Sequence, residues 1–224
     1  MKKTLFVLGA AVLSLVLTAG DCKKASGPDD SGTPPKPPSV KFSSPGTQDA
    51  CSQQANGIIT FANSNTTLLE FFAALPPIVN GNDYTWSIPG SDSLTINVKA
   101  TRQSDGSFTW EVRYNGVQDG ITYANKLILA GTTTSADGAG GSMTAYDDTS
   151  SAVIGTFSWT TSGSDVTGTL IEKDSSQVDT YKIVMTSNSS TGAGTVTTYN
   201  WSGSAWVQEF YATWTSQGGQ AICS

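Results

Sequence analysis

Apolar and polar side chains alternate with a period of two along most of the chain after residue 83. Tyr84, Trp86 and Ile88 alternate with Thr85 and Ser87 at the start of this region. Similar runs, separated by turns of Gly, Asn, Asp and Ser, continue as far as residue 214. This period is typical of β-strands whose two faces meet different surroundings. The pattern predicts about ten short strands, and the tight turns between them favour antiparallel neighbours.

One face of these strands is aromatic and aliphatic, and the other is rich in Thr and Ser. A wide sheet must bury such an apolar face, and it tends to curl as its strands twist. We therefore expect a mainly β fold, an antiparallel up-and-down meander that forms a barrel or half-barrel. A β-sandwich of two sheets is the alternative. Nothing in the sequence indicates an oligomeric state.

A short N-terminal piece of the domain, residues 47–77, follows a helical spacing instead. Its apolar side chains recur at intervals of three and four or their multiples, and Pro76 and Pro77 end any helix before them. Thr67 and Glu70 fit a capping box at the start of a helix. The pattern predicts two short helices, or a strand at residues 58–61 and one helix, that cover an opening of the barrel.

The first 21 residues have the features of a secretory signal peptide. Lys2 and Lys3 precede an apolar run from Leu5 to Leu17 that is too short to span a bilayer. We therefore expect the protein to be exported. Residues 22–46 are rich in Pro, Gly and Ser, which predicts a disordered, extended tether, and residues 47–224 form a single domain.

The segment from Leu17 to Cys22 resembles the end of a bacterial lipoprotein signal peptide, in which the cysteine receives the lipid. Asp21, directly before the cysteine, departs from the pattern of that family, and ordinary cleavage after Gly20 is the alternative. The resemblance implies a protein of the cell envelope, in the periplasm or at the outer membrane surface. It also implies a membrane anchor formed by N-terminal acyl chains on Cys22.

Three cysteines are present, so lipidation of Cys22 would leave an even pair. Cys51 lies at the start of the predicted domain and Cys223 at its end. We expect these two residues to form a disulfide in an oxidising compartment.

Charge and composition exclude several classes of function. The chain has 18 acidic and 12 basic residues and a net charge of −6, so it lacks the basic surface that nucleic acid requires. It has no histidine, which excludes Ser-His-Asp and Cys-His catalysis and the usual histidine-containing metal sites. We therefore expect no cofactor, no metal and no enzymatic activity.

An enzymatic alternative depends on two glutamates. A secreted β domain rich in Gly, Ser, Thr, Asn and Trp superficially resembles the jelly-roll glycoside hydrolases, which need two carboxyl groups inside a sugar cleft. Glu111 and Glu209 are flanked by aromatic residues. The alternation places both on the polar face of their strands, which favours solvated surface charges over catalytic groups.

Five tryptophans are expected on the inner, apolar face, where they form either a packed core or the lining of a cavity: Trp86, Trp110, Trp159, Trp206 and Trp214. A cavity would suit an apolar ligand, as in lipocalins and half-barrel lipoprotein carriers, which the β domain loosely resembles. The leading expectation is a lipid-anchored binding or carrier protein for such a ligand. A structural or adhesive envelope protein is the alternative. Trp201 shares a face with Tyr199, and its ring is a candidate contact for a sugar or a partner.

Overall fold

The computed structural model describes residues 34–35, 40–73 and 75–224, with the backbone alone for residues 65–73. The predicted signal peptide, Cys22 and most of the predicted tether lie outside the described residues. The elements, in chain order, are α1 (Ala50–Ala73), β1 (Ile78–Asn80), β2 (Asp83–Pro89), β3 (Thr95–Arg102), β4 (Phe108–Gln118), β5 (Ile121–Thr133), β6 (Gly140–Tyr146), β7 (Val153–Ser162), β8 (Asp165–Lys173), β9 (Asp179–Asn188), β10 (Gly194–Trp201), β11 (Trp206–Trp214) and β12 (Ile222–Cys223).

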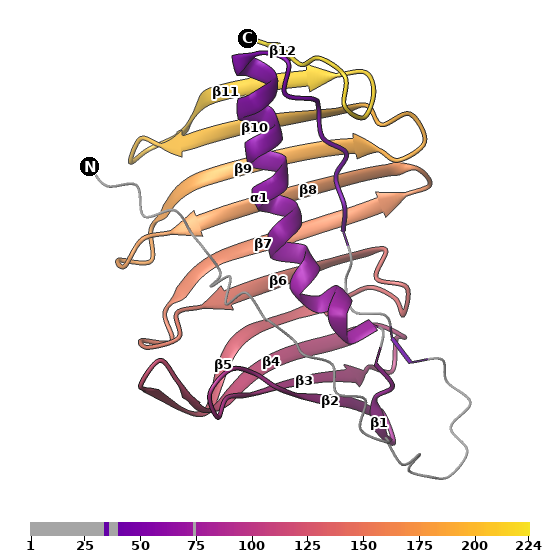
Figure 1. Cartoon of the computed structure of the whole chain (residues 1–224), viewed down its shortest axis with the longest axis vertical. Coiled ribbons are helices and arrows are strands. Elements are labelled where there is room, and N and C mark those ends of the chain that lie inside the picture. The colour runs from indigo at the N-terminus through magenta and orange to yellow at the C-terminus, as the bar shows by residue number, and fades with distance from the viewer. Residues whose placement is uncertain (1–33, 36–39, 74) are drawn as a thin grey trace.

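The strands form one antiparallel sheet in which each strand pairs with the next in sequence, from β1 to β12 (Figure 1). The predicted mainly β meander is confirmed. The prediction of a closed barrel is wrong, because β1 and β12 remain at opposite edges of the sheet. The β-sandwich alternative is wrong as well, because all twelve strands belong to a single sheet. Closure is not needed here to shield the apolar face, since α1 lies across it (Figure 1).

Residues 50–73 form one continuous helix instead of two helices or a strand and a helix. Asp49 caps its start: its side-chain Oδ1 accepts a hydrogen bond of 2.7 Å from the Ser52 amide. Thr67, predicted to begin a second helix, lies inside α1. The polar stretch before it does not interrupt the helix because Asn63 exchanges two hydrogen bonds, of 2.8 and 2.9 Å, with the backbone of Phe42.

Helix α1 is linked to the sheet near both of the sheet's edges. At its N-terminal end Cys51 forms the predicted disulfide with Cys223 of β12, with 5.9 Å between the Cα atoms. Just beyond its C-terminal end, the carbonyl of Leu75 accepts a 3.0 Å hydrogen bond from the indole of Trp86 on β2. The 24 residues of α1 extend about 36 Å. The ten strand spacings from β2 to β12 measure about 48 Å along the sheet, so α1 spans most of the width of the sheet.

An extended segment, residues 40–46, packs beside the helix on the same face. Phe42 is 1% exposed and meets Phe157 edge-on, with 6.4 Å between the ring centroids. Gly168 on β8 makes room for this ring, because a Cβ atom there would lie 2.5 Å from Cζ of Phe42. The backbone of Gly46 and Ser44 is hydrogen-bonded to residues 218 and 219. The segment therefore continues the cover that α1 provides.

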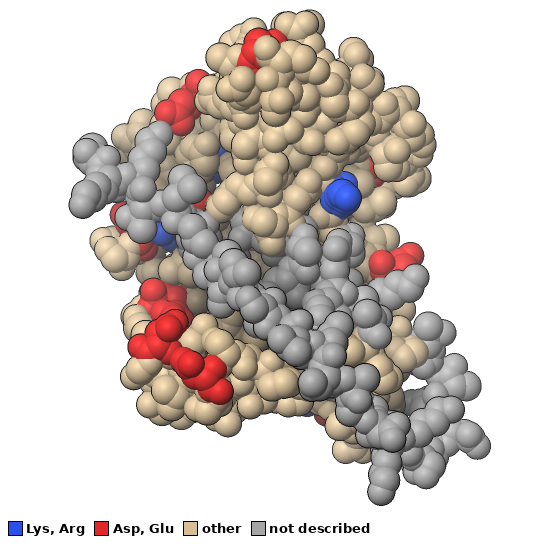
Figure 2. Space-filling view, viewed as in Figure 1, with Lys and Arg blue, Asp and Glu red and all other residues tan. Residues whose placement is uncertain are grey.

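The helix-covered side of the molecule carries few charged groups among the described residues, and acidic side chains gather at its lower left (Figure 2). Within those residues no helix combines the length and the apolar character needed to cross a membrane.

Replacing Cys51 and Cys223 together by Ser should lower the free energy of unfolding by about 5 kcal/mol, because the bond restrains a loop of 172 residues in the unfolded chain. Urea denaturation with and without dithiothreitol measures this effect. Reduced wild type should match the double variant, and the variant should not respond to reductant. An unfolding midpoint of wild type that reductant leaves unchanged would contradict the expectation.

Candidate functional site

Four of the five tryptophans expected on the inner face lie there and are buried. Their exposed fractions are 4% for Trp86, 1% for Trp110, 3% for Trp159 and 2% for Trp214. The first two stack with 5.9 Å between their centroids. These rings pack with apolar side chains of α1 and of residues 40–46 in one continuous cluster. In the described part of the inner face, they therefore fill space as a core does.

The buried indoles are also held by specific hydrogen bonds. Trp86 donates to the carbonyl of Leu75, as described above. Trp110 donates to the hydroxyl of Thr133 over 3.1 Å, and Trp159 donates to the carbonyl of Gly138 over 2.9 Å. The Nε1 atom of Trp214 is buried without a hydrogen-bond partner among the described residues. Three of the four rings are thus fixed in orientation as well as packed.

Trp206 is the exception: it lies on the outer face, where the sequence pattern placed it inside. Thr198 pairs with Phe210 but the next residue, Tyr199, pairs with Gln208, so β11 contains a β-bulge with Glu209 as its extra residue. Because a bulge reverses the alternation beyond it, Trp206 points away from the inner face that Phe210 shares.

On the outer face Trp206 meets Trp201, its partner across the β10–β11 hairpin. The two ring centroids lie 5.3 Å apart, and the ring planes are inclined by 64°. The ammonium of Lys182 on β9 lies 4.2 Å from the centroid of Tyr199 and 4.7 Å from that of Trp206. Together Tyr199, Trp201, Trp206 and Lys182 form a cluster that we call the outer aromatic site.

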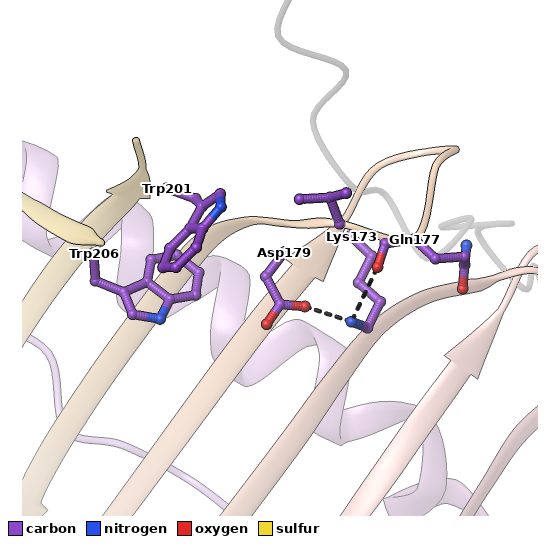
Figure 3. Close-up of a pocket in the computed structure, with 6 residues that line it drawn as sticks. Lys173, Gln177, Asp179, Trp201 and Trp206 are labelled. Atoms are coloured by element: carbon purple, nitrogen blue, oxygen red, sulfur yellow. Dashed lines mark hydrogen bonds and ion pairs between the residues drawn. The ribbon is translucent and has the colours of Figure 1, made fainter. Parts of the chain in front are cut away.

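An open pocket of about 310 Å³ adjoins this cluster (Figure 3). It lies at the end of the strands where the β8–β9 and β10–β11 loops are found, and its lining combines indole rings with charged and polar groups. In the pocket, Lys173 forms an ion pair with Asp179. The lining residues are Lys173, Gln177, Val178, Asp179, Trp201 and Trp206.

A second β-bulge brings Asp179 to the outer face. Glu172 pairs with Tyr181, whereas Lys173 pairs with Asp179, so Thr180 is the extra residue. Bulges of this kind often redirect side chains near functional sites. Other register shifts occur in the β4–β5 and β6–β7 pairs. The bulges at Glu209 and Thr180, in contrast, place an aromatic ring and a carboxylate in the same pocket.

The β8–β9 loop that borders the pocket is held by its own hydrogen bonds. The carboxylate of Asp174 accepts from the amides of Ser176 and Val178 over 2.8 and 3.0 Å. The side-chain amide of Gln177 exchanges two hydrogen bonds with the backbone of Val153, of 3.1 and 3.0 Å. The pocket wall is therefore fixed before any ligand arrives, which lowers the entropic cost of binding.

Outside the pocket, Tyr123 and Asp147 have shifted pKa values that local contacts explain. Burial, and then a 3.0 Å hydrogen bond to Asp148, raise the pKa of Tyr123 to about 12. Hydrogen bonds from Thr149 and Ser150 lower the pKa of Asp147, whose carboxylate organises the β6–β7 loop. Neither Asp147 nor Asp148 lines the pocket.

The two glutamates considered for glycoside hydrolysis are not brought together. Glu111 lies on β4, 3.0 Å from the guanidinium of Arg113, and Glu209 is exposed on β11. Seven strand spacings separate β4 from β11, roughly 34 Å along the sheet. A retaining or inverting pair of carboxyl groups needs a separation below about 10 Å. Among the described residues, no group of three or more acidic or cysteine side chains could hold a metal ion.

The pattern along the chain placed Trp201 and Tyr199 on one face but did not point to Trp206, to Lys182 or to the other residues of the pocket. One signal was available: four residues separate Trp201 from Trp206, and they include a Ser-Gly turn. Residues that flank a tight hairpin loop face each other and share a side of the sheet. Lys173, Asp179 and Lys182 carry no such signal. Asp179 reaches the outer face only through a β-bulge, and Lys182 lies opposite Tyr199 only because of the register between β9 and β10.

Comparison with known proteins finds no matching family, no similar characterised protein and no similar solved structure.

Trp110, whose buried indole N–H is hydrogen-bonded, and Trp214, whose buried indole N–H is not, give a matched test of the core. Trp110→Phe should lower the free energy of unfolding by at least about 1 kcal/mol more than Trp214→Phe. The first change leaves the buried hydroxyl of Thr133 without its donor, whereas the second removes a buried N–H that has no described partner. Urea denaturation of both variants measures the difference. Equal losses would contradict this account of the core.

Proposed function

We propose that this chain is an exported binding protein that holds a saccharide in the pocket beside its outer aromatic site. The observation that carries the proposal is the combination of two partly exposed indoles, Trp201 and Trp206, with a charged and polar wall in one open pocket. In this proposal the helix-covered inner face supports the site and does not bind the ligand.

The chemistry of the lining selects the class of ligand. Indole rings favour a flat apolar surface, whereas the Lys173–Asp179 ion pair loses hydration when it is covered and needs polar groups in return. A sugar ring offers both, since C–H groups form its faces and hydroxyls surround its edge. The volume of about 310 Å³ lies at the small end of the range for ligand pockets.

The structure supports the hypothesis of a carrier for an apolar ligand less well than the hypothesis of a protein with a packed core. A carrier needs free volume between the sheet and its cover, and four tryptophans with exposed fractions of 1–4% occupy the described part of that region. The packed-core alternative accounts for these rings directly. It also allows the outer face to bind a ligand without any opening of α1.

Export and a lipid anchor on Cys22 remain part of the proposal. The Cys51–Cys223 disulfide is consistent with an oxidising, extracytoplasmic compartment. A protein tethered to a membrane by its N-terminus would meet envelope or environmental saccharides directly. Mass spectrometry of the mature N-terminus tests the anchor independently of ligand binding.

A glycan microarray followed by calorimetry with the bound glycan tests the binding function. Trp201→Ala combined with Trp206→Ala should weaken binding at least tenfold, because about 1 kcal/mol or more is lost for each ring. The unfolding midpoint should change little, since both rings lie on the outer face. Trp214→Phe serves as the control and should retain full affinity. A wild-type protein that retains no glycan, or a double variant with unchanged affinity, would overturn the proposal.

A further inference from the structure

Positive side chains outnumber negative ones among the residues of the pocket and the outer aromatic site. Lys173 and Asp179 neutralise each other as an ion pair. Lys182 forms no ion pair with any carboxylate that the structure describes, and its ammonium lies against the faces of Tyr199 and Trp206. The outer aromatic site and its pocket therefore carry one uncompensated positive charge, on a chain whose net charge is −6.

The position of Lys182 leaves its ammonium ready to bind an anion. Contact with the two ring faces restrains the side chain through cation–π attraction, which leaves the charge of the ammonium without a counter-ion. The N–H groups that do not point at the rings remain for an acceptor. Lys182 is not itself a lining residue of the pocket, but its ammonium lies over the ring of Trp206, which is one. The ammonium therefore borders the space that a ligand packed on this ring would occupy.

From this arrangement, and resting on the proposed saccharide function, we infer that the site selects sugars that carry an acidic group. Lys182 is the specificity-determining residue and binds the carboxylate or phosphate of the ligand. The indoles of Trp201 and Trp206 pack against the sugar ring itself. A neutral sugar would occupy the same rings but would leave the ammonium with no anionic partner.

Calorimetry with matched pairs of sugars tests this inference: glucose against glucuronate, and galactose against galacturonate. The wild-type protein should bind the acidic member of a pair about tenfold more tightly, as one added charged hydrogen bond at a partly exposed site predicts. Glucose 6-phosphate, as a third probe, distinguishes recognition of a phosphate from recognition of a carboxylate. Higher salt should reduce the preference, because it screens partly exposed charges.

Two variants separate a role in selectivity from a role in stability. Lys182→Gln should weaken binding of the acidic sugar about tenfold more than binding of the neutral sugar, and so abolish the preference. Lys182→Arg keeps the charge and should keep the preference. A purely structural lysine would change the affinity for both members of a pair equally.

Failure of the inference about acidic sugars can be distinguished from failure of the proposed saccharide function. Equal binding of the acidic and neutral sugars by wild type, or an equal loss of both in Lys182→Gln, would overturn the inference and leave saccharide binding intact. Absence of binding for every sugar tested would overturn the saccharide function and the inference together.

Discussion

Helix α1 is attached near both edges of the sheet, and these two attachments hold it over the apolar face. The Cys51–Cys223 disulfide fixes one end of the helix at β12, and the Trp86–Leu75 hydrogen bond fixes the other at β2. An open sheet of twelve strands would otherwise expose one whole apolar face to water. With the helix held there, α1 and residues 40–46 pack against the tryptophans of the inner face.

This arrangement gives the two faces of the sheet different tasks. The inner face is occupied by packed and hydrogen-bonded rings, so it contributes stability. No helix of the described part of the chain crosses the outer face. That face is rich in hydroxyl groups, and Trp201 and Trp206 meet on it at the β10–β11 hairpin. Two bulges, at Thr180 and Glu209, move Asp179 and Trp206 to that face. The proposed binding at the outer aromatic site would therefore need no rearrangement of the core.

Much of the fold was predictable from the alternation of side chains, but features set by contacts distant in the sequence were not. The period of two located the main strands and their antiparallel order, and cysteine counting located the disulfide. The continuous helix was missed because Asn63 is a weak helix former whose bonds to Phe42 are invisible in the sequence. The barrel was wrong because strand number alone does not determine whether edges meet. Trp206 was misplaced because a single extra residue, Glu209, reverses the alternation that its spacing from Phe210 and Trp214 implied.

Four tryptophans belong to the core, whereas Trp201 and Trp206 belong to the proposed ligand site. Fluorine NMR of protein labelled with 5-fluorotryptophan tests this division directly, because the chain contains six tryptophans and each can be assigned by substitution. We expect a soluble paramagnetic probe to broaden only the resonances of Trp201 and Trp206, and an added saccharide ligand to shift the same two. Broadening or ligand-induced shifts at Trp86, Trp110, Trp159 or Trp214, with Trp201 and Trp206 unaffected, would contradict the account and place the binding site on the inner face.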